Sequence, residues 1–316
     1  MSKRRVVVTG GAGFIGSRVC ALLVEKGYAV RVLDNLYRAD PRVVAEQRQH
    51  PDMEFVEGDI RYRGTVDAAL EGAEGVVHLA ALCINKSVAD PAESLDVNLR
   101  GSEHVFAAAA RARVRRLVFA SSASVYGEPE RLPMREDDVL RPQTPYCIAK
   151  RASEDLLEFY RTRHGLASNA LRFFNVYGPG QKTDAYYTSV IQVFLRRIVA
   201  GEAPVIDGDG SQSMDFVHVD DVARSVVMAY TSEASGLVLN VGTGIDTSIA
   251  ELAKMLVAAT GRALEPEFRP RKTLVTRRAA DISRIRAALG WEPLTAVAPG
   301  IHALARTFLA ELGALP

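Results

Sequence analysis

The sequence is poor in cysteine, in net charge and in long apolar runs. It has three cysteines among 316 residues, and Cys20, Cys83 and Cys147 lack C-x-x-C spacing, so we expect neither disulfides nor a zinc site. The formal net charge is +1 and the charges are interspersed, which offers no electrostatic basis for binding nucleic acid or a membrane surface. No apolar stretch approaches the ~18 residues of a membrane-spanning helix.

The N-terminal segment also lacks the apolar core that directs export. Only three valines separate the basic start from a glycine-rich loop, which is too few for a signal peptide. The chain has no internal repeat and no low-complexity linker. We therefore expect a soluble, cytoplasmic protein with one large α/β domain and a smaller lobe, or with two modest domains.

Glycine is abundant near the N-terminus. A short apolar strand at residues 3–8 leads into a G-G-x-G-x-x-G loop, and residues 14–26 then have the apolar spacing of a helix. Strand, glycine turn and helix in this order are the context of a dinucleotide-binding fingerprint, which places a pyrophosphate at the helix N-terminus. The glycines allow a tight turn, close approach of the pyrophosphate and packing of helix on strand, tasks that we assign to Gly10 or Gly11, Gly13 and Gly16.

Asp34 indicates which dinucleotide fits. It follows a second apolar strand at residues 29–33 and lies about 20 residues beyond the loop, where an acid binds the adenosine ribose hydroxyls. The carboxylate also repels the 2′-phosphate of NADP, and neither Asn35 nor Leu36 supplies a compensating arginine. We therefore predict NAD as the cofactor. The alternative is that Asp34 only begins a turn.

Strand signals alternate with helices through the first half of the chain. We expect further strands at 54–56, 75–79, 116–120 and 170–173, and helices at 66–70, 93–112 and 145–164. This alternation predicts an α/β fold with a doubly wound parallel sheet. After Asn175 the order breaks down, with helices expected at 186–200, 249–260 and 282–289, a turn-rich segment at 204–210 and a strand at 238–241. We predict a Rossmann domain from residues 1–174 plus 216–243, and a smaller C-terminal α/β substrate lobe from residues 175–215 plus 244–316.

A tyrosine and a lysine four residues apart carry the chemistry. Thr144 suits the N-cap and Pro145 the first position of a helix, so Tyr146 and Lys150 project from one helical face. A free phenol has a pKa near ~10, but an ammonium group, the helix dipole and an oxidised nicotinamide all favour the phenolate. The alternative is an ordinary amphipathic helix. Ser122 favours catalysis, because it ends a predicted strand at the edge where open α/β sheets bind ligands.

Together these residues resemble the short-chain dehydrogenase/reductase superfamily, and within it the extended branch that modifies nucleotide sugars. The resemblance covers nearly the whole chain. Besides the glycine loop and the Y-x-x-x-K pair, it rests on blocks in family order: DNL at 34–36, GDI at 58–60, HLAA at 78–81, Asn98, SSASVYG at 121–127, LRFFNVYGP at 171–179, DFVHVDD at 215–221 and NVG at 240–242.

The resemblance implies positions for both ligands. NAD is expected to contact the glycine loop, the ends of the strands and the catalytic pair, namely Gly10, Gly13, Phe14, Ile15, Gly16, Asp34, Asn35, Leu36, Asp59, Ile60, Leu79, Ala80, Ala81, Asn98, Ser121, Tyr146, Lys150, Phe173 and Val176. The nucleotide sugar is expected to contact Ser122, Tyr146, Asn175, Val190, Val205, Asp207, Gln212, Arg271 and Arg278. Members of the branch commonly dimerise through a four-helix bundle, here residues 93–112 and 145–164, so we expect a homodimer.

The residues after Ser122 separate the reactions of the branch. Sugar 4,6-dehydratases carry an Asp-Glu pair there, because eliminating water needs a second acid and a second base. UDP-glucuronate decarboxylases usually keep the glutamate, and GDP-mannose 3,5-epimerases have a cysteine. This chain has Ala123 and Ser124, so it resembles a UDP-hexose 4-epimerase. Tyr146 is then expected to take the C4 hydroxyl proton as hydride passes to NAD, while Ser122 hydrogen-bonds O4 and Lys150 holds the nicotinamide ribose.

Two departures from the branch bear on the sugar. Met214 replaces a usual arginine, and Arg271 matches a phosphate-binding arginine without the glycine and aspartate that normally follow. Arg278 aligns with a gating position near the hexose, where a cation suits a C6 carboxylate. Further donors to that carboxylate are Arg277, Lys182 and Thr183. We predict the pair UDP-glucuronate and UDP-galacturonate, with UDP-glucose and UDP-galactose as the alternative if the arginines are only solvated surface residues.

Two other classes of function stay open. A reductase of nucleotide 4-ketosugars would use the same Ser122, Tyr146 and Lys150, but it would need dissociable NAD(P)H and an external keto substrate. A non-catalytic dinucleotide sensor would keep the glycine loop without needing those three residues, and their presence argues against it.

Overall fold

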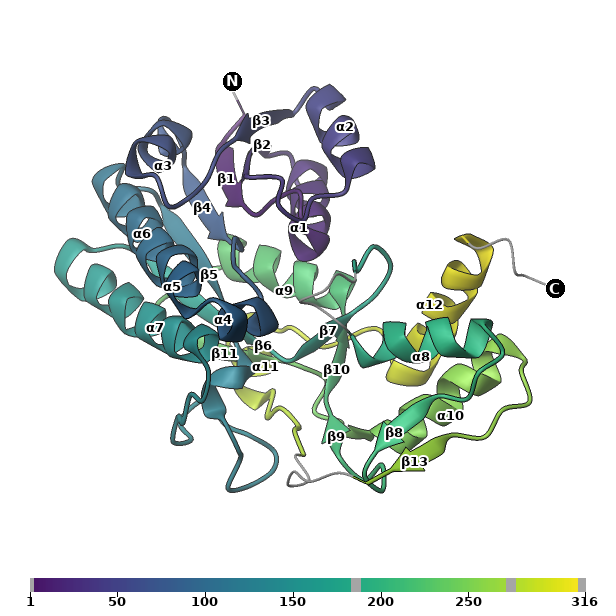
Figure 1. The fold of residues 1–316 in the computed structure, drawn as a ribbon. Helices are drawn as coiled ribbons and strands as arrows, with labels where there is room; N and C mark the ends of the chain where they lie inside the picture. The colour runs from purple at the N-terminus through teal and green to yellow at the C-terminus, as the bar shows by residue number, and fades with distance from the viewer. Residues whose placement is uncertain (1–2, 183–188, 271–276, 312–316) are drawn as a thin grey trace.

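The computed structural model describes residues 3–182, 189–270 and 277–311. At its centre lies a seven-stranded sheet with the order β11-β6-β5-β4-β1-β2-β3 (Figure 1). All of its neighbouring pairs are parallel. The chain winds outward from β1 in both directions, which confirms the predicted doubly wound sheet. The strands are β1 (Arg5–Thr9), β2 (Ala29–Asp34), β3 (Met53–Glu57), β4 (Gly75–His78), β5 (Arg116–Ser122), β6 (Ser168–Phe173) and β11 (Leu237–Val241).

Helices cover both faces of this sheet. Because side chains alternate between the faces of a strand, Val6 and Val8 of β1 join one apolar core and Val7 joins the other. Burial on both faces explains the near-continuous apolar runs in the sequence. The first core contains α1 (Phe14–Glu25) and α9 (Val219–Thr231), and the second contains α3 (Arg63–Leu70), α6 (Ser102–Arg111) and α7 (Pro145–His164) (Figure 1).

The helix expected at residues 93–112 is not a single α-helix. The structure has α5 (Pro91–Leu95), a π-helical segment η1 (Asp96–Gly101) and then α6. Asn98 lies in the π-helical segment, where its side chain accepts from Leu82 N at 2.8 Å and donates to Leu82 O at 3.1 Å. Apolar periodicity predicts the buried face of such a helix but not a side chain that bonds to a distant backbone segment.

A further apolar core belongs to the C-terminal part of the chain, on the right of Figure 1. It lies among α8 (Val190–Val199), α10 (Ile249–Thr260) and α12 (Val297–Glu311). Two short sheets stand beside it, β8 (Val205–Asp207) with β13 (Glu267–Arg269) and β9 (Ser213–Met214) with β12 (Thr247–Ser248). β7 (Asn175–Tyr177) and β10 (Phe216–His218) form a parallel pair of their own. The division of the chain into two domains stays a prediction.

Several elements go beyond the sequence patterns. The patterns do not predict α2 (Pro41–Gln49), α4 (Ile84–Ala89), α9 or α12, although Asp40 and Pro41 provide a helix start signal whose cap bond forms. The helix expected at 186–200 is α8, and residues 186–188 lie outside the described residues. α11 (Ser283–Leu289) confirms the helix expected at 282–289.

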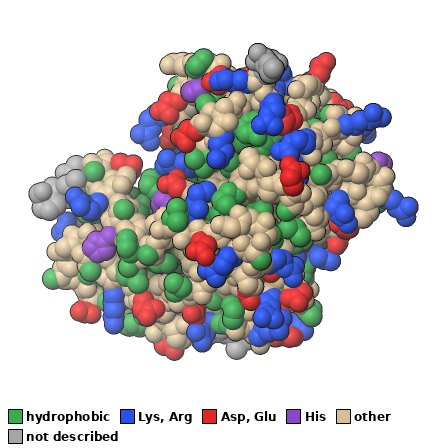
Figure 2. Space-filling view, turned by 180° about the vertical axis from the view of Figure 1, so that it is seen from behind, with side chains coloured by type: hydrophobic (Ala, Val, Ile, Leu, Met, Phe, Trp, Pro, Cys, Tyr) green, Lys and Arg blue, Asp and Glu red, His purple; other side chains and the backbone are tan. Residues whose placement is uncertain are grey.

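The surface carries both signs of charge. On the face seen in Figure 2, acidic and basic side chains lie interspersed among apolar and neutral ones. Within the described part of the chain, no helix combines the length and the apolar character needed to cross a membrane.

Candidate active site

A pocket of about 730 Å³ lies at the carboxyl ends of the strands of the large sheet. This is the edge where the chain reverses between β1 and β4, and where doubly wound sheets bind ligands. The structure brings most of the predicted cofactor residues together here: Gly10, Gly13, Phe14, Ile15, Gly16, Asp34, Asn35, Asp59, Ile60, Leu79, Ala80, Ala81, Ser121, Tyr146, Lys150 and Phe173. Leu36, Asn98 and Val176, also predicted for the cofactor, are not among the residues that line it.

The glycine loop leaves no room for side chains where the prediction needs glycine. Gly10 has a φ of +69°, and a Cβ there would lie 2.8 Å from Ala80 N, in the loop after β4. A Cβ on Gly16 would lie 2.1 Å from Gly10 O, so α1 packs directly on the loop. Gly13 is the N-cap of α1 and provides no side-chain cap, which leaves the first amides of the helix for an anion.

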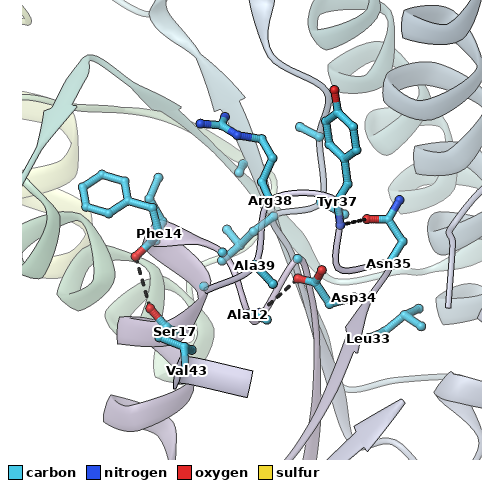
Figure 3. Close-up of a pocket in the computed structure, with 18 of the residues that line it drawn as sticks. Ala12, Phe14, Ser17, Leu33, Asp34, Asn35, Tyr37, Arg38, Ala39 and Val43 are labelled. Atoms are coloured by element: carbon cyan, nitrogen blue, oxygen red, sulfur yellow. Dashed lines mark hydrogen bonds between the residues drawn. The ribbon is translucent and has the colours of Figure 1, made fainter. Parts of the chain in front are cut away.

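Asp34 is buried at the end of β2 and organises the backbone around it (Figure 3). Its Oδ2 accepts from Ala12 N at 3.0 Å, and its Oδ1 accepts from Leu36 N at 2.9 Å. Leu36 has a φ of +63°, the turn conformation that brings its amide back to Asp34. Burial raises the pKa of the Asp34 carboxyl, and the two amides oppose that rise. Asp34 therefore joins the glycine loop to the segment after β2.

The loop after β3 contributes a second carboxylate to the pocket. Asp59 accepts from Arg61 at 2.8 and 3.0 Å and from Asn35 Nδ2 at 2.9 Å. Although burial acts to raise it, the pKa of Asp59 is lowered by these bonds from Arg61 and Asn35. Asp59 thus stays an anion at the rim where the sequence predicts the adenine.

Tyr146 and Lys150 reach the pocket from the first turns of α7. Thr144 is the N-cap, with its Oγ1 accepting from Cys147 N at 3.3 Å, and Pro145 occupies the first turn as predicted. Lys150 is buried, donates from Nζ to Ala120 O at 2.8 Å and lies 5.7 Å from the centre of the Tyr146 ring. Burial lowers the pKa of Lys150 to about 7.

Ser122 ends β5 and starts the 3-10 turn η2 (Ala123–Tyr126). Its Oγ accepts from Ser124 N at 3.2 Å and lies 2.8 Å from Ser124 Oγ. Ser121, predicted at the cofactor, donates its hydroxyl to Glu154 Oε1 at 2.5 Å. Sequence reasoning missed Glu154, although its place one turn after Lys150 on the same helical face was visible.

The residues predicted for the substrate separate into several places. Asn175 donates both its N and its Nδ2 to Asp215 O, at 3.0 and 3.3 Å. Gln212 donates to Asp207 O at 2.9 Å, which joins it to β8, the strand of Val205, while Val190 begins α8. Arg271 and Thr183 lie outside the described residues.

The two neighbouring arginines have different environments. Arg278 donates from Nη2 to Gly127 O at 3.2 Å, and burial lowers the pKa of its guanidinium while Glu128 opposes that shift. Arg277 is exposed and pairs with Asp246 at 2.6 Å. Arg278 therefore faces the loop after Ser122, whereas Arg277 is engaged on the surface.

Other residues of the pocket were not predicted. Figure 3 shows Tyr37 and Arg38 beside Asp34, in the segment between β2 and α2. Gln47, on the unpredicted α2, donates to Gly11 O at 2.8 Å and so supports the glycine loop. No group of His, Cys, Asp or Glu side chains among the residues that the structure describes is arranged to hold a metal ion.

The chain belongs to the NAD dependent epimerase/dehydratase family, which matches residues 6–242. The glycine cradle, the free helix end and Asp34 fit the NAD on which the family depends. The UDP-glucose 4-epimerase of Mycolicibacterium smegmatis is 38% identical over 306 residues, with 94% of this chain and 96% of that protein covered.

Solved structures agree with this assignment. The UDP-glucose 4-epimerase of Thermotoga maritima, solved with UDP-glucose, has a TM-score of 0.90 and 34% identity, and the match covers 98% of this chain and 99% of that one. MoeE5, solved with UDP-glucuronic acid and NAD, has a TM-score of 0.86 and 32% identity, and the match covers 97% of this chain and 99% of that one.

Proposed function

We propose that this protein is an NAD-dependent UDP-sugar 4-epimerase that interconverts UDP-glucuronate and UDP-galacturonate. The observation that carries the proposal is where α7 meets the end of β5. Tyr146 and Lys150 of α7 line the pocket, Ser122 ends β5 directly after the pocket residue Ser121, and Ala123 and Ser124 follow it.

In the proposed reaction the chain's own residues move one proton and hold the sugar. The glycine loop and Lys150 would hold NAD, which would supply the hydride acceptor and donor for C4. Tyr146 takes the C4 hydroxyl proton and later gives it back, and Lys150, 5.7 Å from its ring, favours the phenolate. Ser122 hydrogen-bonds O4. The 4-keto sugar turns over while the diphosphate stays bound near Asn175, so reduction on the other face inverts C4.

The residues after Ser122 favour epimerisation over dehydration. Loss of water from a 4-keto sugar needs an acid and a base beyond Tyr146. Ala123 is buried and carries no polar group, and the Ser124 hydroxyl lies 2.8 Å from Ser122 Oγ. Neither can perform the second proton transfer.

Arg278 supports the uronate. Its guanidinium is largely buried beside the loop that follows Ser122, and a charge-assisted bond to a C6 carboxylate would replace water that burial has removed. MoeE5, whose structure holds UDP-glucuronic acid, is a similar protein. Lys182 is a weaker candidate for a carboxylate donor, because its Nζ donates to Ala39 O at 2.8 Å.

The uronate proposal is tested by comparing neighbouring arginines. Arg278→Ala should lower kcat/KM for UDP-glucuronate by about 10- to 100-fold, the value of a hydrogen bond to a charged group, with a smaller loss for UDP-glucose. Arg277→Ala is the matched control and should change neither, since Arg277 pairs with Asp246. Equal losses for both sugars in Arg278→Ala would place this arginine on the diphosphate and favour UDP-glucose epimerisation.

The epimerase proposal is tested without added cofactor. The purified protein should contain NAD, released by denaturation, and should convert each UDP-sugar of the pair into the other. Release of NADP, or turnover of a keto sugar only with added NAD(P)H, would favour the reductase. A protein that retains NAD but converts no sugar would favour the dinucleotide sensor.

We propose in addition that two copies associate through α5–α6 and α7. Ile148 and Phe159 of α7 lie three helical turns apart on one face and are 49% and 48% exposed, and Leu95 at the end of α5 is 40% exposed. Light scattering of the purified protein should give twice the chain mass, and Phe159→Glu should give monomers. A monomeric wild type would refute this part of the proposal.

A further inference from the structure

Glu154 is a buried carboxylate behind the proposed catalytic residues. It lies on α7, one turn after Lys150 and two turns after Tyr146, and its side chain is 3% exposed. Its Oε1 accepts from Ser121 Oγ at 2.5 Å and from Arg172 Nε at 2.9 Å, and its Oε2 accepts from Arg172 Nη2 at 2.7 Å. Such a group is stable in a protein interior because every one of these partners is present.

Two contacts attach the end of β5 to α7. Lys150 Nζ donates to Ala120 O at 2.8 Å, and the hydroxyl of the next residue, Ser121, donates to Glu154. Successive side chains of a strand point to opposite faces. Holding Ser121 toward α7 therefore determines the direction of Ser122, the residue expected to bond O4.

Arg172 extends this network to β6 and to the turn that follows Ser122. It lies on β6 and donates its third group, Nη1, to Glu136 O at 3.0 Å. Its guanidinium lies 4.8 Å from the centre of the Tyr126 ring, at the end of the turn that Ser122 caps. The ion pair of Glu154 on α7 and Arg172 on β6 thus also contacts β5 and the turn η2.

The charges around Lys150 depend on Glu154. The titratable groups that face its ammonium are Tyr146 and Glu154 on α7 and His78 on β4, with Arg172 of β6 behind Glu154. Burial lowers the pKa of His78 to about 3, so His78 is neutral at neutral pH. Burial also lowers the pKa of Lys150 to about 7, and Glu154 opposes that shift.

We propose that Glu154 is a positioning residue for the reaction proposed above: it fixes the direction of Ser122 at the end of β5 and favours the ammonium form of Lys150. The group of Lys150, Arg172 and the Glu154 carboxylate carries one net positive charge, and Arg151, 3.7 Å from Glu154 Oε2, adds none because it pairs with Asp155 at 2.9 Å. That charge stabilises the Tyr146 phenolate.

The direction in which Glu154→Gln shifts the pKa of Tyr146 follows from where the charges lie. Glu154→Gln removes a negative charge and leaves the positive charge of Arg172 without its carboxylate partner. Both changes lower the pKa of Lys150, so its ammonium group loses its proton at a lower pH. Tyr146 then loses the positive charge of Lys150, whose Nζ is 5.7 Å from its ring, whereas Arg172 lies beyond Glu154. The phenol of Tyr146 should consequently ionise at higher pH.

The first measurement follows tyrosinate absorbance in the NAD-loaded protein and needs no sugar. The Tyr146 signal is obtained by subtracting the titration of Tyr146→Phe in each background. In Glu154→Gln its midpoint should rise by about one pH unit. The matched control is Glu158→Gln, the same change one turn further along α7, where Glu158 is half exposed and pairs with Arg161. An unchanged or lower midpoint in Glu154→Gln would overturn the charge role.

The second measurement separates geometry from charge by activity. Glu154→Gln should lower kcat by about 10- to 100-fold with KM little changed, as for a misplaced catalytic group, and activity should decline with rising pH earlier than in wild type. Glu154→Asp keeps the negative charge, so its activity should decline with rising pH at the same pH as in wild type. Its kcat should stay low, because the shorter side chain does not restore the geometry. Wild-type kcat in Glu154→Gln would overturn the geometric role.

A second variant covers the case in which Glu154→Gln does not fold, and the wild type tests the proposed reaction itself. If Glu154→Gln does not fold, Ser121→Ala removes one of the bonds to Glu154 and keeps the ion pair, so it should lower kcat a few-fold without moving the alkaline limb. Wild-type kcat in that variant, or a loss that lies only in KM, would overturn the inference. A wild type inactive on every UDP-sugar would refute the proposed reaction, and the tyrosinate titration would still test Glu154.

Discussion

Gly16→Ala provides a sharp test of the cofactor site. The new Cβ would lie 2.1 Å from Gly10 O and 2.7 Å from Gly11 Cα, and both of these atoms belong to the backbone. A normal contact would require the loop and the start of α1 to move apart by about 1 Å, since interiors are packed without free space. The glycine loop and the first amides of α1 would then no longer face the same phosphate.

The size of the effect follows from the donors that move. Hydrogen bonds to charged groups contribute about 1.5–3 kcal/mol each, so losing one of them weakens NAD binding by roughly 10- to 100-fold. The assay is equilibrium binding of NAD to protein freed of cofactor, together with the NAD content after purification. Gly64→Ala is the matched control, because a Cβ there meets nothing within 4 Å. Wild-type affinity in Gly16→Ala, with an unchanged melting temperature, would refute the packing argument.

Other substitutions test the catalytic helix. Tyr146→Phe should lower turnover by about 10²- to 10⁴-fold, the loss of a general acid–base group, with NAD content unchanged. Ser122→Ala should lower turnover by a smaller factor than Tyr146→Phe. Lys150→Ala should reduce both turnover and the NAD content of the purified protein, measured in the same assays. Thr144→Ala removes the cap that accepts from Cys147 N and should lower the free energy of unfolding by about 1 kcal/mol in urea titrations. Near wild-type turnover in Tyr146→Phe would refute the mechanism, and an unchanged stability in Thr144→Ala would refute the role of the cap.

The glycine loop and the helix after it were predictable because their signals are local. They lie with Asp34 within one strand–helix–strand unit, and backbone geometry requires glycine in the loop. The predicted ribose position of Asp34 stays untested. What the sequence did not indicate is that its carboxylate also accepts from Ala12 N and Leu36 N and so shapes the loop.

The partners of buried polar groups were not predictable. The spacing of Lys150 and Glu154 is visible in the sequence, but nothing local indicates that Arg172, on another strand, supplies the opposite charge. Asn98, in the π-helical segment, likewise bonds through its side chain to the backbone of Leu82, a partner that nothing local indicates. Such pairings depend on which elements the sheet order brings together, and apolar periodicity reports only which face is buried.

The substrate side depends on contacts between distant segments, and Asp215 shows how. Its buried carboxylate accepts from Thr243 N at 2.7 Å and from Ala280 N at 3.0 Å, while its own carbonyl accepts from Asn175. Asp215 therefore links the segment that carries Arg278 to Asn175, the residue expected at the diphosphate. Arg278 itself donates its backbone N to Ser213 O at 3.1 Å, so its position depends on a bond to a distant segment as well as on its neighbours in the sequence. Two adjacent arginines that look equivalent in the sequence consequently end in different places, one at Gly127 and one at the surface.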